Sequence, residues 1–252
     1  MTVFNAYAAY YDLLYRDKDY AHESSYVLAL LAEQGICGGR LLELGCGTGR
    51  HAEFLGTAGF RVHGVDLSEK MVAIATERLG VSPSGHCFEV ADVRTLRLDQ
   101  VFDAVVALFH VVSYQSSNHD LESTFANAAA HLRLGGVFLF DFWYGPGVLT
   151  DRPSMRVKEM SDHACSVLRI AEPLMLPNEN CVDVQYRIWV EDRATARLHR
   201  IEEVHRMRYL FMPELQRLAT DHGLRIVGAY AGHSREALGF NTWTGTVMAV
   251  RM

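Results

Sequence analysis

The sequence predicts an α/β protein in which a seven-strand, mostly parallel sheet is covered by helices on both faces. Apolar runs of strand length alternate with helical patterns along most of the 252 residues. The run FDAVVAL, residues 102–108, is nearly continuous in apolar residues, as expected for a strand buried on both sides. The stretches 181–190 and 199–211 alternate between polar and apolar residues, which predicts that the segment 148–210 is an insertion with antiparallel strands.

The stretch RLLELGCGTG, residues 40–49, is the centre of this pattern. Its apolar residues form one buried strand that runs into Gly45, Gly47 and Gly49, and a helical pattern starts directly after them. Glycine permits positive φ and close approach of a ligand, and the free N–H groups of a helix start point towards that ligand. Asp66, 21 positions after Gly45 and at the end of the next strand, can accept hydrogen bonds from ribose hydroxyls. We therefore expect an adenosine-containing cofactor.

Two residues near the turn narrow the choice of cofactor. The dinucleotide fingerprint G-x-G-x-x-G needs a third glycine where this chain has Arg50. Glu43 lies two residues before the first glycine, where it would repel a pyrophosphate and attract an amino group. The resulting pattern, E-x-G-x-G-x-G, resembles the first motif of the class I S-adenosylmethionine (SAM) methyltransferases. The resemblance implies SAM as cofactor, S-adenosylhomocysteine as product, and a Rossmann-like sheet with the strand order 3-2-1-4-5-7-6.

The resemblance also implies cofactor contacts beyond the turn. In the family an apolar residue directly after the ribose-binding acid lies against the adenine ring, which makes Leu67 a candidate. Met71 is a second candidate whose position also suits the protein core. An acid after the third strand accepts from the adenine amino group beside a backbone N–H, and Asp92 and Val93 fit this pattern.

An aromatic pattern precedes the first strand. Tyr7, Tyr11 and Tyr15 recur every four residues and so share one face of a helix predicted over residues 4–15. In the resembled family such a segment, followed by KDY, caps the cofactor cleft. Aromatic faces and tyrosine oxygens suit a sulfonium cation, and a cap excludes water. Tyr11 and Tyr20 are therefore expected to touch the cofactor, although simple packing of an aromatic helix face explains Tyr11 equally well.

The remaining elements are predicted from helix caps, apolar periodicity and glycine or proline stops. Helices are expected at residues 22–34, 68–79, 118–133 and 213–222. Strands of the main sheet are expected at residues 61–65, 86–90, 102–108, 137–142, 224–230 and 244–251. Strands of the insertion are expected at residues 181–190 and 199–211, with one or two more within residues 155–170.

Three parts of the chain are expected. Residues 1–147 and 211–252 should form the SAM-binding core, with residues 1–35 as a helical cap. Residues 148–210 should form a β-rich insertion that covers the active site. Trp243, at the end of the polar loop AGHSREALGFNTW before the last strand, is expected to contact the acceptor.

Chemistry is expected at the carboxyl edge of the sheet, where the ligands of open α/β sheets bind. Phe109, His110 and Tyr114 follow one strand, and Trp143 and Tyr144 follow the next. We assign Phe109 to the cofactor, His110 and Tyr114 to catalysis, and Trp143 and Tyr144 to the acceptor. A hydrogen-bonded loop histidine would explain His110 equally well.

The insertion carries a local excess of arginine. Residues 187–208 contain six arginines and four acids in a chain that is acidic overall. Alternation places Arg206 and Arg208 on one strand face and His205 and Met207 on the other. If the first face looks into the cleft, Arg208 can hold a phosphate or carboxylate of the acceptor bidentately. Cross-strand ion pairs on a solvated face explain most of these arginines without a ligand.

Composition narrows the partners and the compartment. With 21% charged residues and a net charge of -6, an extended nucleic-acid surface is not expected. No apolar run reaches the roughly 20 residues of a membrane span and no secretory pattern opens the chain, so we expect a cytoplasmic protein without a membrane partner. Five cysteines without a C-x-x-C pair predict no disulfide framework, and the histidine spacing predicts no metal. The sequence does not decide between a monomer and a homodimer.

These features together predict methyl transfer to a small molecule. The segments YDLLY and KDY, FWYGPG after the fifth strand, and the β insertion are most similar to methyltransferases that N-methylate amino sugars carried on nucleotides. This similarity implies an amine acceptor and a place in natural-product biosynthesis. O- or C-methylation of another small metabolite is the main alternative. A nicotinamide-dependent dehydrogenase, against which Arg50 argues, and a non-catalytic SAM-binding protein are the others.

Overall fold

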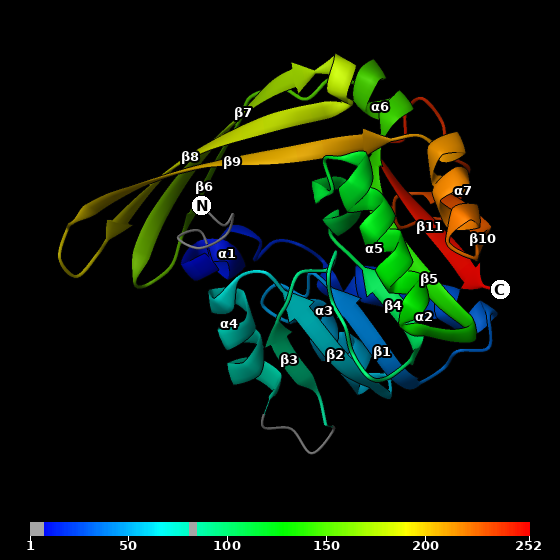
Figure 1. The fold of residues 1–252 in the computed structure, drawn as a ribbon. Coiled ribbons are helices and arrows are strands. Elements are labelled where there is room, and N and C mark those ends of the chain that lie inside the picture. The colour runs from blue at the N-terminus through cyan, green and yellow to red at the C-terminus, as the bar shows by residue number, and fades with distance from the viewer. Residues whose placement is uncertain (1–7, 81–84) are drawn as a thin grey trace.

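The computed structural model describes residues 8–80 and 85–252, so residues 4–7 of the predicted first helix lie outside it. Figure 1 shows a central sheet with helices on both sides and a long β sheet that arches away from it. The elements are α1 (Ala8–Leu14), α2 (Tyr20–Glu33), β1 (Gly39–Leu44), α3 (Arg50–Thr57), β2 (Phe60–Asp66), α4 (Glu69–Leu79), β3 (Cys87–Val90), β4 (Phe102–Ala107), η1 (Val111–Tyr114), α5 (Asn118–Ala130), β5 (Leu132–Tyr144), α6 (Gly145–Thr150), β6 (Arg156–Ser161), β7 (Cys165–Leu176), η2 (Pro177–Glu179), β8 (Cys181–Asp192), β9 (Leu198–Leu210), α7 (Met212–Asp221), β10 (Leu224–Ala231) and β11 (Thr244–Arg251).

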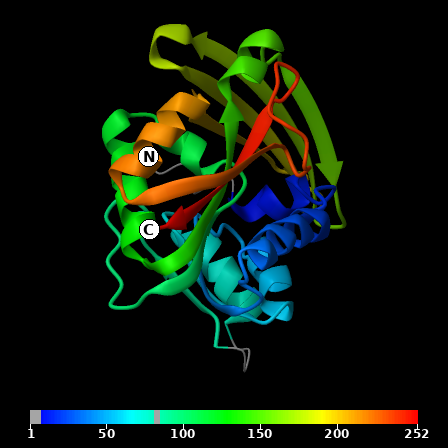
Figure 2. The same cartoon turned by 90° about the vertical axis from the view of Figure 1, so that its right-hand side faces the viewer.

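The main sheet has the order β3-β2-β1-β4-β5-β11-β10. Strands β1 to β5 pair in parallel, whereas β11 runs antiparallel to both β5 and β10. In Figure 2 the red β11 lies beside the orange β10 at this end of the sheet. Because β11 is the seventh strand of the main sheet and β10 the sixth, the predicted fold class and the order 3-2-1-4-5-7-6 are confirmed.

Alternate residues of the strands face two separate cores. On one side Leu42 and Phe138 pack with apolar residues of α5 and α7. On the other side Leu41 and Leu139 pack with apolar residues of α2 and α3. Both faces of the sheet are therefore covered, which is why its strands appear in the sequence as continuous apolar runs.

The junction between α5 and β5 differs from the prediction. Helix α5 ends at Ala130 rather than at residue 133, and β5 begins at Leu132, five residues before the predicted start. Leu132 already pairs with Phe102, and a register shift follows it. Gly135, with φ of 74°, lies in this irregular stretch and allows the strand to continue through it.

Strands β6 to β9 form an antiparallel sheet from residues of the predicted insertion. Strand β9 also pairs in parallel with the end of β5, through Trp143 with Tyr209 and Tyr144 with Leu210, so this sheet continues the main one. Helix α1 lies between β6 and α4, and its Leu14 packs among apolar residues of β7 and β8 (Figure 1). Within residues 8–80 and 85–252, no helix is both long enough and apolar enough to cross a membrane.

Candidate active site

Gly45, Gly47 and Gly49 connect β1 to α3 with φ of 69°, 52° and 75°. A Cβ added at Gly45 would lie 2.4 Å from Val111, so no side chain fits there. At Gly47 no described atom other than those of the turn's adjoining residues lies within 4 Å of the Cβ position. The turn is therefore packed on one side and open on the other, which leaves room for a ligand against its backbone.

Asp66, at the end of β2, lies directly beside this turn. Its Oδ2 accepts from Gly47 N at 3.0 Å and its Oδ1 from Ser68 N at 2.9 Å. Burial raises the pKa of Asp66, while these hydrogen bonds oppose the rise. Because each carboxylate oxygen has two lone pairs, the group has capacity for the ribose hydroxyls expected there.

Glu43, at the end of β1, is buried, and its Oε2 has no hydrogen-bond partner among the described residues. His51 Nδ1 lies 3.8 Å from Oε1. Burial and the charge of Asp66 raise the pKa of Glu43 to about 8. A buried acceptor without a donor fits the amino group of a cofactor, which would supply the missing partner.

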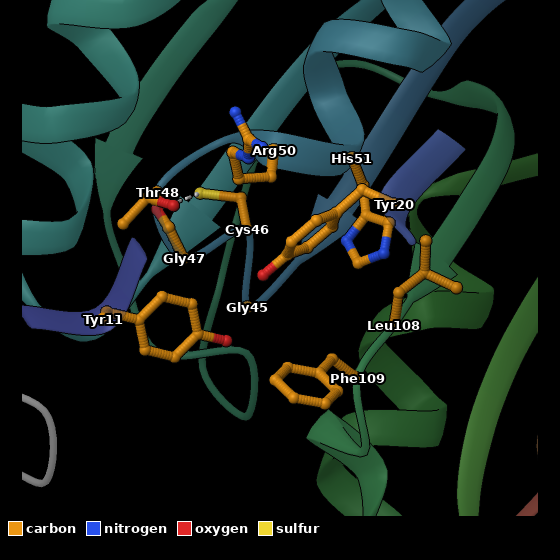
Figure 3. Close-up of a pocket in the computed structure, with 10 residues that line it drawn as sticks. All are labelled: Tyr11, Tyr20, Gly45, Cys46, Gly47, Thr48, Arg50, His51, Leu108 and Phe109. Atoms are coloured by element: carbon orange, nitrogen blue, oxygen red, sulfur yellow. Dashed lines mark hydrogen bonds between the residues drawn. The ribbon is translucent and has the colours of Figure 1, made fainter. Parts of the chain in front are cut away.

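A pocket opens between α1, the glycine turn and the end of β4 (Figure 3). The rings of Tyr11, Tyr20 and Phe109 surround it. Lys18 Nζ lies 4.4 Å from the ring centre of Phe109 and 4.9 Å from that of Tyr20, so these rings already hold a cation and suit a sulfonium. The lining residues are Tyr11, Tyr20, Gly45, Cys46, Gly47, Thr48, Arg50, His51, Leu108 and Phe109.

Half of these lining residues were not predicted to lie in the site. They are Cys46, Thr48, Arg50, His51 and Leu108. The sequence did contain a signal for Thr48, Arg50 and His51, because residues at the start of the helix after a glycine turn must border the ligand bound there. His51 Nε2 lies 2.9 Å from Glu23, which also pairs with Lys18. Burial raises the pKa of Glu23, but the bonds from His51 and Lys18 outweigh burial and lower it to about 2.

Helix α1 is tied to the turn through Asp12. Thr48 Oγ1 donates to Asp12 Oδ1 at 2.7 Å. Arg78 on α4 pairs with the same carboxylate and donates to the carbonyl oxygen of Thr48 at 2.8 Å. The cap therefore has specific polar anchors on two elements of the core.

The predicted adenine contacts lie beyond the residues that line this pocket. Leu67 is 48% exposed, so its side chain is accessible to a ring, whereas Met71 and Val93 are buried. Asp92 accepts from Arg94 Nε and Nη2 at 2.9 and 2.6 Å, and these bonds lower the pKa of Asp92. An adenine amino group would therefore share Asp92 with Arg94, and core packing alone accounts for Met71.

His110 is held at the end of β4 by Asp141. Phe109 and His110 have φ of 62° and 69°, which is rare outside glycine and indicates local strain. His110 N donates to Asp141 Oδ1 at 2.8 Å, and His110 Nδ1 lies 3.1 Å from Oδ2. Burial raises the pKa of Asp141, but the charge and hydrogen bonds of His110 outweigh it and lower that pKa. The imidazole is thus fixed, with Nε2 directed away from Asp141.

Tyr114, the second residue assigned to catalysis, ends η1 and packs against β8 and β9. Its hydroxyl lies 2.8 Å from Nδ1 of His205 on β9. Burial raises the pKa of Tyr114 well above its ordinary value. His110 and Tyr114 therefore come from one short stretch but are held by different strands, β5 and β9.

The aromatic residues assigned to the acceptor separate into two groups. The ring of Trp143 lies 6.4 Å from that of His110 and 4.6 Å from that of Trp243, between centroids. Trp243 Nε1 donates to the carbonyl oxygen of Asp151 at 2.7 Å. Tyr144 packs instead in the core under α5 and α7. The prediction for Tyr144 does not hold, because successive strand residues point to opposite faces of the sheet.

The structure also corrects the prediction for Arg208. Its guanidinium is buried, donates to Asn118 Oδ1 at 2.8 Å and forms an ion pair with Glu214. The face of β9 that turns towards Tyr114 is the one that carries His205. Alternation separated the two faces correctly, but the face with Arg208 binds other parts of the protein rather than an acceptor.

We therefore expect Arg208→Lys to lower the free energy of unfolding by about 1–3 kcal/mol, because one ammonium cannot replace both Nη2, which bonds Asn118 and Glu214, and Nη1, which donates to the carbonyl oxygen of Ser116 at 3.4 Å. The KM for the acceptor should stay unchanged. Denaturant unfolding and steady-state kinetics measure the two effects. The control is Arg206→Lys, whose exposed pair with Asp183 should contribute little. A raised KM at unchanged stability would restore the ligand-binding role.

Comparison with known proteins identifies the family. Residues 41–136 match the family model described as a methyltransferase domain. The chain is 30% identical over 234 residues to the dTDP-3-amino-3,4,6-trideoxy-alpha-D-glucopyranose N,N-dimethyltransferase of Streptomyces venezuelae, covering 92% of this chain and 95% of that protein.

Solved structures agree over nearly the whole chain. The crystal structure of Streptomyces venezuelae DesVI is 26% identical with a TM-score of 0.81 and coverage of 98% of both chains. An S-adenosylmethionine-dependent methyltransferase from Clostridium acetobutylicum has the same fold, with a TM-score of 0.83 at 22% identity and 99% coverage of both chains. The chain thus belongs to the methyltransferase family that includes the Streptomyces venezuelae N,N-dimethyltransferase, and it is an enzyme that uses SAM as its cofactor.

Proposed function

We propose that the enzyme methylates the amino nitrogen of an amino sugar carried on a nucleotide. The main support is that similarity to the Streptomyces venezuelae N,N-dimethyltransferase covers almost the full length of both proteins. It therefore includes the cap and the insertion as well as the methyltransferase domain at residues 41–136. Arg208, which first suggested an anionic acceptor, no longer contributes to this proposal.

The residues around the glycine turn fit SAM, which supplies an activated methyl group on a sulfonium. Asp66 would hold the ribose hydroxyls, and Glu43 the amino group. The faces of Tyr11, Tyr20 and Phe109 would surround the sulfonium, where a lysine ammonium already lies over two of these rings. The cap, held through Asp12, would exclude water from this pocket.

The acceptor would bind where β4, β5 and the insertion meet. His110, Trp143 and Trp243 lie together there, and Tyr114 faces β9. The insertion would cover this region. Methylation of a neutral amine by a sulfonium needs alignment more than acid–base chemistry, so His110 and Tyr114 would mainly orient the amine and assist removal of its proton.

The direct test is to incubate the purified enzyme with methyl-labelled SAM and a panel of nucleotide-linked sugars. The panel contains 3-amino and 4-amino sugars, each with a matched sugar that carries a hydroxyl at the amino position. Label in the amino sugars, located on nitrogen by mass spectrometry, would support the proposal. Label in the hydroxyl analogues alone would favour O-methylation, and label in neither would exclude this substrate class.

We expect His110→Ala and Tyr114→Phe each to lower kcat by about 100-fold or less, the low end of the loss seen when a general base is removed. Alignment of the amine with the sulfonium should supply most of the rate acceleration, and each single substitution only weakens this alignment. Steady-state kinetics and SAM affinity are measured for both variants. A far larger loss of kcat at unchanged SAM affinity would show that the removed group is an obligatory acid or base.

A further inference from the structure

A chain of hydrogen bonds links the insertion to the candidate active site. Glu203 Oε2 lies 3.1 Å from His205 Nε2, and His205 Nδ1 lies 2.8 Å from the Tyr114 hydroxyl. His205 is only 2% exposed, whereas Tyr114 is partly exposed. None of the sequence patterns assigned a role to Glu203 or His205.

The chemistry of Glu203 fixes the direction of these bonds. An ionised carboxylate only accepts, so His205 Nε2 carries the proton and Nδ1 accepts from the Tyr114 hydroxyl. Burial lowers the pKa of His205, although Glu203 partly opposes this, which keeps the ring neutral as the arrangement requires. The phenol proton therefore points to β9, and the oxygen lone pairs point elsewhere.

Tyr114 lies close to the cofactor turn. It ends the short helix η1, whose first residue, Val111, packs directly against Gly45 of the turn. Tyr114 also packs against the same apolar cluster as Trp143 and Trp243, the two tryptophans assigned to the proposed acceptor region. A phenol oxygen in this place, whose own hydrogen is donated to His205 in a hydrogen bond, is suited to accept a hydrogen bond from an amine.

We propose that His205 and Glu203 are positioning residues that act through Tyr114, so that the insertion supplies part of the catalytic arrangement as well as its cover. This inference rests on the proposed N-methylation. When the amine nitrogen gains the methyl group, as the S–CH3 bond of the sulfonium breaks to leave a neutral thioether, one of the N–H protons of the amine passes to the Tyr114 oxygen. The phenol proton passes at the same time to His205 Nδ1, and Glu203 stabilises the resulting imidazolium.

The kinetic test is a double-mutant cycle with any acceptor that the enzyme methylates. Tyr114→Phe and His205→Leu should each lower kcat by a similar factor, about tenfold to 100-fold. The double variant should be no slower than either single variant, because both remove the same bond. His205→Asn, which keeps an acceptor near the position of Nδ1, should recover part of the loss. Multiplied effects in the double variant, or a His205→Leu variant as fast as wild type, would overturn the proposal.

A control separates positioning from packing. His131 is also buried, and its two ring nitrogens also bond within the protein, to Leu98 N and to the carbonyl oxygen of Asn127, but it lies away from the site. His131→Leu should lower the melting temperature as His205→Leu does, without lowering kcat below that temperature. An equal loss of kcat in both variants would make His205 structural.

Nitrogen NMR of the histidine side chains tests the arrangement without any substrate. One neutral ring, identified by its absence in His205→Asn, should carry its proton on Nε2, and its Nδ1 signal should move in Tyr114→Phe. A proton on Nδ1 at neutral pH would overturn the proposal. Because no acceptor is present, this result is independent of whether nucleotide-linked amino sugars prove to be substrates.

Discussion

Glu43→Gln should stabilise the free enzyme at pH 8 and weaken its binding of SAM. The folded-state pKa of Glu43, about 8, lies above the ordinary glutamate value because the carboxyl is buried. The folded state therefore holds a proton that the unfolded state loses, and stability falls as pH rises from the ordinary value towards 8. At pH 8 the raised pKa of Glu43 lowers the free energy of unfolding of the wild type by up to about 5 kcal/mol. The glutamine variant, which cannot ionise, should recover this loss of stability.

The loss of SAM affinity has a separate cause. A charged hydrogen bond to the cofactor amino group contributes about 1.5–3 kcal/mol, so its loss should weaken binding about tenfold or more. Wild-type Glu43 should also release a proton when SAM binds at pH 7, because the ammonium favours the ionised carboxylate.

Calorimetry in buffers with different heats of ionisation measures both the affinity and the protons released. Unfolding by denaturant at pH 6 and pH 8 measures stability. The matched control is Glu77→Gln on α4, an exposed glutamate that should change neither quantity. Unchanged affinity in Glu43→Gln, or a wild-type heat that does not depend on the buffer, would contradict the role of Glu43.

Asp66→Ala should weaken SAM binding about tenfold or more while the protein stays folded, since two charged hydrogen bonds to ribose hydroxyls are lost. The structure adds a second reason. The same carboxylate holds the backbone N–H groups of Gly47 and Ser68, so its removal also loosens the turn.

Two further variants, one graded and one a control, accompany this test. Asp66→Asn keeps one acceptor oxygen and should fall between wild type and Asp66→Ala. Asp99→Ala removes an exposed acid and should leave the affinity unchanged. The assignment fails if calorimetry finds wild-type affinity in a folded Asp66→Ala variant.

Features that depend on local chemistry could be predicted from the sequence alone. The glycine turn could be predicted because only glycine adopts positive φ at three nearby positions without strain, and all three do. The position of Asp66 could be predicted because it ends a parallel strand, and the carboxyl ends of parallel strands lie at the edge of the sheet where ligands bind. The insertion strands could be predicted because alternation is a property of a single strand.

Tertiary structure decided which face of each strand meets the site. Alternation put His205 and Arg208 on opposite faces of β9, but the face that meets the site depends on how the insertion packs on the core. Trp143 and Tyr144 were both assigned to the acceptor, although they too lie on opposite faces of their strand. The packing of the insertion on the core turns His205 to Tyr114 and gives Arg208 to Glu214. The bonds that hold His110 and Tyr114 likewise join residues from distant parts of the chain. Sequence spacing carries no record of such contacts, because they form only when separate elements fold together.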